Sequence, residues 1–239
     1  MVPIEQILQA QLKRLSQITN SSSNELLDSN KYQQHADLLI ACANEILAKH
    51  GKTFVIDDGN RMVLRFLLYY FNRCEVATEV FPNKGYDLNK NIMLAGPVGS
   101  GKTLLMDAFS LYLRRTNNPM WFRNISVTEL LNYYKLTNTI NPFTYNICDG
   151  HGIEGDPQNV CLNDVGLQTQ QFYGNDTKLI IQEFFHARNE IFVMDGKNAH
   201  ITTNLDVMAI KREFHDEYDR LVDRFKTYNV LHLSGASRR

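Results

Sequence analysis

Residues 92–103 read Ile-Met-Leu-Ala-Gly-Pro-Val-Gly-Ser-Gly-Lys-Thr. Four apolar residues run into a turn with three glycines, and the turn ends in a Lys-Thr pair. Glycine has no Cβ, so this backbone can curl until several N–H groups point at one phosphate. Lys102 can then reach the outer phosphates, Thr103 can offer its hydroxyl to Mg²⁺, and a helix from about Lys102 adds its positive end. The stretch therefore predicts a strand, a phosphate-binding loop and a helix that together bind a nucleoside triphosphate.

Composition and charge are ordinary for a globular protein and exclude several other classes. The chain has 239 residues, 44% of them hydrophobic, and a net charge of −1, which gives no global electrostatic case for nucleic acid. The four cysteines are scattered without a CxxC pair, as expected in a reducing cytoplasm. The start of the chain does not resemble a signal peptide. The longest apolar run, 63–71, contains Arg65 and is too short to span a bilayer. We expect a cytoplasmic protein without a membrane segment.

The N-terminal third is expected to be helical. Apolar residues recur at helical spacing over 4–18, a polar stretch over 19–24 reads as a linker, and further helices are expected over 33–49 and 60–72. These apolar faces can pack against the rest of the protein, or the first helix can dock on a partner protein. We divide the chain into a helix with its linker (1–24), a helical region (25–89) and a core (90–239).

From Lys90 onward, strands and helices alternate, as in a parallel sheet covered on both faces. The predicted strands are 91–95, 121–127, 160–162, 199–203 and 229–233. Predicted helices cover 102–115, 128–136 with Thr128 as the cap, 177–190 with Asp176 or Thr177 as the cap, 207–214 and 217–225, and 138–158 is expected to be a loop. The expected fold class is α/β, a P-loop nucleoside-triphosphatase core of three layers with a five-stranded parallel sheet, preceded by a small helical N-terminal region.

A second chemical element is expected where an acidic pair at the end of a strand holds Mg²⁺ and polarises water. The candidate is Asn163-Asp164-Val165-Gly166, in which an Asn stands where an acid is usual. In one register, Asn163 takes the Mg²⁺ position and Asp164 orients water; in the other, Asp164 serves Mg²⁺ and Val165 leaves no base. Gly166 favours the first register. An Asn offers a carbonyl oxygen without charge, so we expect nucleotide binding to survive and turnover to be slow.

Two further elements carry polar groups suited to a γ-phosphate. Asn204 follows the predicted strand 199–203, where its amide can position the attacking water; its alternative role is to cap the next helix. Arginines recur near the C-terminus, at Arg220, Arg224 and Arg238-Arg239. Arginine supplies planar, permanently charged donors for phosphate, within a subunit or across an interface, and a solvated basic face is the alternative.

Together these segments resemble the DnaC/IstB group of AAA+ ATPases, the helicase loaders and transposition helpers. The resemblance covers about Lys90 to the C-terminus. It rests on the 96–103 loop, Asn163-Asp164-Val165-Gly166, Tyr173-Gly174, Thr202-Thr203-Asn204-Leu205, the run from Tyr218 to Phe225, and Gly235-Ala236-Ser237-Arg238-Arg239. Two positions depart from the family pattern: Asn163 replaces an acid, and Asp219 replaces a frequent glycine.

The resemblance implies a role for each matching residue. It implies an AAA+ type core with ATP and Mg²⁺ as cofactors. Asn204 would be the sensor-1 residue, Arg224 the arginine finger that reaches a neighbour's nucleotide, and Arg239, or else Arg238, the sensor-2 arginine. The expected nucleotide-binding residues are Gly96, Pro97, Val98, Gly99, Ser100, Gly101, Lys102, Thr103, Leu104 and Arg239. The expected metal-site residues are Thr103, Asn163 and Asp164, and the catalytic set is Asp164, Asn204 and Arg224.

The resemblance also implies partners and a task. It implies self-association through the ATP site into a ring or spiral, DNA contact at a surface that we do not assign, and loading or remodelling of a DNA-acting partner. The expected partner is a replicative helicase. The alternatives are an ATP-gated, weakly hydrolysing partner of a transposase, or a P-loop kinase acting on a small molecule.

Overall fold

The computed structural model describes residues 25–146, 155–166, 171–172, 175–213 and 223–235. These residues form two compact units. One unit contains residues 25–89 and 103–121, and the other contains 90–102 and the described residues from 122 onward. The division of the chain into 1–24, 25–89 and 90–239 stays a prediction, and the helix expected over 4–18 lies outside the described residues.

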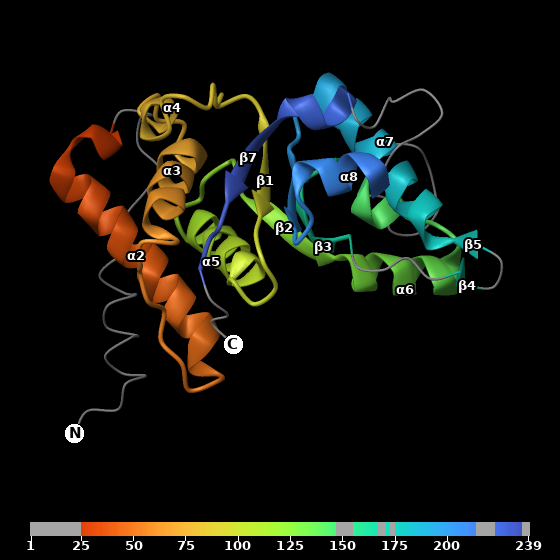
Figure 1. The fold of residues 1–239 in the computed structure, drawn as a ribbon, viewed down its shortest axis with the longest axis horizontal. Coiled ribbons are helices and arrows are strands. Elements are labelled where there is room, and N and C mark those ends of the chain that lie inside the picture. Colours follow the sequence, from red (N-terminus) through yellow and green to blue (C-terminus); the bar gives the residue numbers. More distant parts are fainter. Residues whose placement is uncertain (1–24, 147–154, 167–170, 173–174, 214–222, 236–239) are drawn as a thin grey trace. The chain divides into compact units, whose positions relative to one another are not determined.

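The second unit is built on a parallel sheet with the strand order β2-β3-β6-β1-β7 (Figure 1). The strands are β1 (Asn91–Ala95), β2 (Phe122–Ser126), β3 (Asn159–Val165), β6 (Ala199–Thr203) and β7 (Tyr228–His232). All residues of β1 and β6 are buried, as expected for central strands of a parallel sheet. The predicted five-stranded α/β core is confirmed. A short antiparallel pair, β4 (Gln171–Phe172) and β5 (Asn175–Asp176), stands apart from this sheet.

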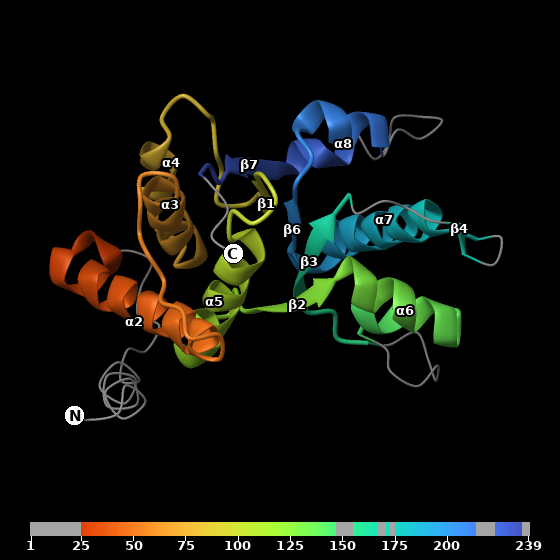
Figure 2. The ribbon, with the colours of Figure 1, turned by 60° about the horizontal axis from the view of Figure 1, so that its bottom comes forward.

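Helices α6 (Val127–Thr137) and α7 (Thr177–Asp195) pack against the sheet and against each other (Figure 2). Their apolar side chains form one core with those of the strands, including Leu130, Phe184 and Ile201. The unit also contains α8 (Val207–Glu213) and two 3₁₀ turns, η2 (Asn141–Phe143) and η3 (Phe225–Thr227). Most of the helix predicted over 217–225 lies outside the described residues.

The first unit is helical. It contains η1 (Glu25–Leu27), α2 (Ser29–Ala48), α3 (Arg61–Phe71), α4 (Ala77–Val80) and α5 (Lys102–Arg115). Helix α5 begins at the phosphate loop, yet from Thr103 onward it belongs to the same unit as α2 and α3. Phe109 of α5 packs on Phe71 with a ring separation of 5.1 Å, and Arg115 pairs with Glu45 of α2 at 2.6 Å. In the described part of the chain, no helix is both long and apolar enough to cross a membrane.

Several predicted boundaries were wrong. Helix α2 begins at Ser29 and not at residue 33, and α7 continues to Asp195 and not to residue 190. Two further differences have a physical reason in the hydrogen bonds. Helix α6 is capped by Ser126 and not by Thr128, because the Ser126 Oγ accepts the Glu129 N–H at 2.9 Å while Thr128 lies inside the first turn. Strand β3 extends beyond the predicted 160–162 to Val165, because neighbouring strands supply hydrogen bonds to the polar residues at its end.

Candidate nucleotide site

The loop that follows β1 has the backbone that a phosphate cradle requires. Gly99 and Gly101 have φ angles of 82° and 92°, in the left-handed region where a side chain is strained. The turn begins with a hydrogen bond from the Ser100 N–H to the Pro97 carbonyl at 3.2 Å, and Ser100 is buried. The exposed Val98 lies at the outer side of the turn. The glycines at these two positions are therefore required by the loop conformation.

Gly96 lies at the point where the loop leaves the sheet and passes close to the end of β7. A Cβ at this position would lie 2.3 Å from the carbonyl oxygen of Leu233. The backbone is held on both sides: Gly96 N–H donates to the Thr203 carbonyl at 3.2 Å, and Leu233 N–H donates to the Ala95 carbonyl at 2.8 Å. No larger residue fits between these strand ends, so the sequence motif and the packing require the same glycine.

Lys102 turns its ammonium group back onto the loop. Its Nζ donates to the carbonyl oxygens of Gly96 at 2.7 Å and Pro97 at 2.8 Å, and the residue is 6% exposed. Carbonyl dipoles hold a buried cation less firmly than an anionic group does, so a phosphate oxygen is the stronger acceptor for this ammonium group. Thr103 and Leu104, the next residues of α5, are half-buried. The donors present here fit a triphosphate.

Asn163 lies at the carboxyl end of β3 in a neutral hydrogen-bonded network. Its Oδ1 accepts from the Thr202 hydroxyl at 3.1 Å, and its Nδ2 donates to Asn124 Oδ1 at 3.1 Å. These partners come from the two strands that flank β3, and Asn163 is 3% exposed. The amide is thus engaged on both of its polar atoms by other neutral groups.

Asp164 follows on a β-bulge between Leu162 and Val165. Its φ of 63° is in the left-handed region, which Asp tolerates better than most residues, and its N–H donates to the Thr202 hydroxyl at 3.0 Å. The bulge turns the half-buried Asp164 side chain out of the regular alternation of the strand. Within the residues that the structure describes, no group of three or more His, Cys, Asp or Glu side chains could hold a metal ion.

The turn after β6 presents Asn204. Thr203 ties this turn together: its hydroxyl donates to the Val165 carbonyl at 2.7 Å and accepts from the Leu205 N–H at 3.0 Å. Asn204 itself is exposed at the carboxyl end of the strand, and the helix that follows is capped by Asp206, whose carboxylate accepts the Ala209 N–H at 2.6 Å. The alternative assignment of Asn204 as that cap is therefore not supported.

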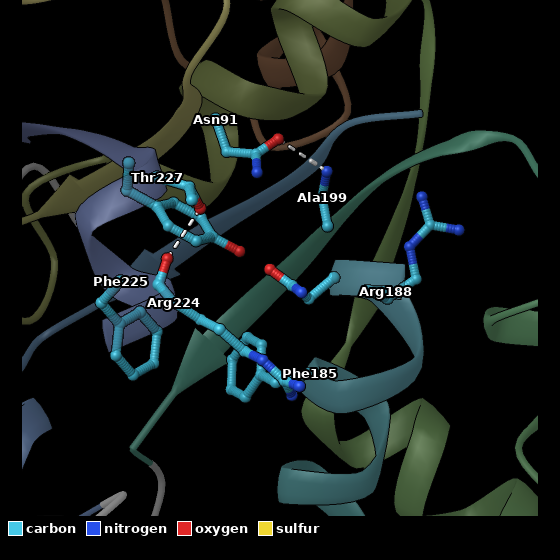
Figure 3. A pocket seen from close by; sticks show the side chains of 9 residues that line it. Asn91, Phe185, Arg188, Ala199, Arg224, Phe225 and Thr227 are labelled. Atoms are coloured by element: carbon cyan, nitrogen blue, oxygen red, sulfur yellow. Dashed lines mark hydrogen bonds between the residues drawn. The ribbon is translucent and has the colours of Figure 1, made fainter. Parts of the chain in front are cut away.

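Arg224 lies at the opposite edge of the sheet. It precedes η3 and β7, and Ala95 at the end of β1 pairs with His232 at the far end of β7. At roughly 3.3 Å per residue, the length of β7 alone is about 13 Å, so Arg224 is remote from the loop of its own chain. Its guanidinium contacts the Nδ1 of His186 on α7. Its side chain lies beside that of Phe185 (Figure 3). Arg238 and Arg239, Tyr173-Gly174 and the run 218–222 lie outside the described residues.

The structure thus brings most of the predicted residues to one edge of the sheet. The loop 96–102, Asn163, Asp164 and Asn204 all lie at the carboxyl ends of β1, β3 and β6, where parallel α/β sheets bind their ligands. Sequence reasoning missed Asn124 and His186. A polar residue at the centre of the predicted strand 121–127 is a usable signal for Asn124, whereas nothing in the sequence distinguishes His186 from other surface residues of a helix.

The comparisons with known proteins agree with this geometry at the level of the fold. No family model matches the sequence, and no curated protein matches it. Among solved structures, DnaI is similar with a TM-score of 0.54 and 19% identity, over 79% of this chain and 89% of that chain. The DnaC helicase loader is similar with a TM-score of 0.51 and 15% identity, over 76% of this chain and 93% of that chain. The chain shares the α/β fold of these two structures.

Proposed function

We propose that this chain is an AAA+ ATPase of the DnaC/IstB group that binds Mg-ATP, assembles with further copies of itself, and loads or remodels a DNA-acting partner in the cytoplasm. The observation that carries the proposal is the 96–103 loop with the Lys102 ammonium held on the Gly96 and Pro97 carbonyls. A cation buried on carbonyl groups, beside glycines that allow several N–H groups to converge, is suited to a polyphosphate. The fold shared with DnaI and the DnaC helicase loader supports a replicative helicase as the partner.

The position of Arg224 supports an ATP site shared between copies. Because it lies at the amino end of β7, it is remote from the phosphate loop of its own chain. An arginine that serves a γ-phosphate from this position has to reach the nucleotide of another copy. Arg239 would contact the nucleotide within its own chain, and Asp164 and Asn204 would orient water. Thr103 and Asn163 would hold Mg²⁺ and complete the proposed site.

A second candidate function is an ATP-gated switch with weak hydrolysis. The network Asn124–Asn163–Thr202 favours it, because it puts neutral groups where a carboxylate would hold Mg²⁺. Such a protein binds Mg-ATP and docks its partner, a helicase or a transposase, without rapid turnover. Both candidates require nucleotide-dependent assembly, and they differ in the turnover rate.

The test measures the mass of the purified chain with and without Mg-ATP, single-stranded DNA and a replicative helicase from the same source. We expect Mg-ATP to produce a larger assembly that captures the helicase, and Arg224→Ala to bind Mg-ATP but remain small. A chain that stays monomeric with Mg-ATP, DNA and helicase together would contradict the proposal. Phosphate transfer to a nucleoside or nucleotide, measured in parallel, would instead support the small-molecule kinase.

A further inference from the structure

The segment before β7 is docked on α7 through two consecutive residue pairs. The Arg224 guanidinium contacts the Nδ1 of His186, and the ring of Phe225 meets that of Phe185 edge-on with centroids 5.5 Å apart. The backbone at this point is also fixed, because the Thr227 hydroxyl donates to the Arg224 carbonyl at 2.7 Å (Figure 3). The segment therefore has its backbone, its aromatic side chain and its guanidinium each held in place.

In the contact between Arg224 and His186, arginine can only donate and histidine must accept. A guanidinium carries only donors, so the His186 Nδ1 accepts and that nitrogen carries no proton. One of the five guanidinium donors is used by this contact, and the guanidinium can offer others to a second acceptor. An arginine side chain that is already ordered loses less conformational entropy when it meets a phosphate than one that is free in solvent.

We propose that His186 is the positioning residue for Arg224: it holds the guanidinium in the orientation in which a second copy of the chain presents its nucleotide γ-phosphate. This inference rests on the proposed function, because it takes Arg224 as the group that acts between copies. It adds a residue on α7, outside the phosphate loop and the C-terminal segment, to the surface that completes the neighbour's site. His186 itself does not touch the nucleotide.

The role can be isolated with two complementary chains. The first carries Arg224→Ala and keeps its phosphate loop, so it binds nucleotide and lacks the arginine. The second carries Lys102→Ala and keeps Arg224, so it supplies the arginine and lacks the loop lysine. A fluorescent ATP analogue with Mg²⁺ reports the affinity of the first chain as the second is added. Binding is the readout, so the experiment does not depend on the rate of hydrolysis.

The second chain is expected to tighten nucleotide binding by the first about tenfold, the range of one charge-assisted hydrogen bond. His186→Ala in the arginine-donating chain should remove most of this tightening. The same substitution in the nucleotide-binding chain should leave it within about twofold, because that chain has no Arg224 to orient. A general structural defect would not follow this asymmetry.

Two matched variants complete the design. His186→Asn in the donating chain keeps a short hydrogen-bond acceptor on α7 and should restore at least half of the lost tightening. Met194→Ala, on the same helix and 83% exposed, should change nothing. Equal effects of His186→Ala in both chains, or no effect in either, would overturn the positioning role while leaving the shared site intact. If the two parent chains show no tightening at all, Arg224 does not act between copies, and the proposed shared site fails together with this inference.

Discussion

At the scale of single residues, the proposed function makes Asn163 the residue that sets the rate of ATP turnover. Asn163→Asp supplies the missing carboxylate, and we expect ATP turnover to rise about tenfold or more because Mg²⁺ then has a charged ligand. The new carboxylate cannot donate to Asn124 Oδ1, so the Asn124 amide has to rotate and the fold should lose about 1 kcal/mol. Steady-state phosphate release and chemical denaturation measure the two effects.

The control for this substitution is Asn163→Ala, which removes the hydrogen bonds to both Asn124 and Thr202 without adding a charge. It should be destabilised and show no gain in turnover. If the Asp and Ala variants hydrolyse ATP at the same rate as the unmodified chain, the neutral network does not limit turnover, and the weakly hydrolysing candidate loses its support.

His200, a residue of β6 with no exposed surface, makes stability depend on pH. Its Nδ1 accepts the Ile92 N–H at 3.0 Å, and burial, with a smaller contribution from the Arg188 charge, lowers its pKa from 6.5 to about 3. Below pH 6.5, His200 is protonated in the unfolded chain but stays neutral in the folded chain. The free energy of unfolding therefore falls as the pH falls toward 3. Between pH 6.5 and 4.5 this one group should lower the free energy of unfolding by about 2 kcal/mol.

The measurement is the free energy of unfolding at several pH values, compared with His200→Asn. The Asn side chain keeps an acceptor for the Ile92 N–H and does not titrate, so its stability should fall less steeply in this window. Parallel curves for the two chains would show that His200 does not titrate on unfolding. Carboxylates affect both chains equally and cancel in the difference.

At the scale of elements, Ser126 caps the start of α6, whereas the sequence suggested Thr128. Ser126→Ala removes the Oγ that accepts the Glu129 N–H, and the free energy of unfolding should fall by about 1 kcal/mol. Thr128→Ala is the matched control: it removes a hydroxyl from an exposed position in the first turn and should cost less than about 0.5 kcal/mol. Equal losses for both variants would contradict the cap assignment.

Comparing the predicted strands with the observed ones shows which elements local sequence patterns can specify. Strands β1 and β6 were predicted with their full bounds, because every residue is buried and apolar or neutral. Strand β3 was predicted too short, because Asn163 and Asp164 look like loop residues when their partners are unknown. The bonds that keep them in the strand come from Thr202, 38 and 39 positions later in the chain. Long-range partners of polar groups are the information that local patterns lack.

In the candidate site, too, local patterns predicted some residues and missed the partners that are distant in the sequence. The loop 96–103 and Asn204 were predicted because local spacing carries their chemistry. The network around Asn163 depends on Asn124 from another strand, and the contact of Arg224 depends on His186 from α7. Neither partner has a fixed spacing from the residue that it contacts, so the sequence pattern predicted Asn163 and Arg224 and missed Asn124 and His186.

At the scale of the whole molecule, α5 contributes to both the phosphate loop and the helical unit. It begins with Lys102 and Thr103 at the phosphate loop, and its middle is bonded into the helical unit through Tyr112. The Tyr112 hydroxyl bonds with His35 Nδ1 of α2 and with the Asn72 amide just after α3. Helix α5 thus follows the phosphate loop directly in the chain and is hydrogen-bonded to the helices of the N-terminal region.

This connection predicts that Mg-ATP protects the helical unit. Ligand binding stabilises the elements that it orders, so amide exchange in α2 and α3 should slow when Mg-ATP binds the loop. Tyr112→Phe removes the hydroxyl that links α5 to His35 and Asn72, and it should reduce this protection at least about threefold while the affinity for Mg-ATP stays within about twofold. Hydrogen exchange followed by mass spectrometry measures the protection peptide by peptide.

The control is Tyr32→Phe, which removes a hydroxyl from α2 outside this network and should keep the full response. If Tyr112→Phe keeps the full response as well, the helical unit responds to nucleotide through contacts other than the Tyr112 hydroxyl, such as the pair between Arg115 and Glu45.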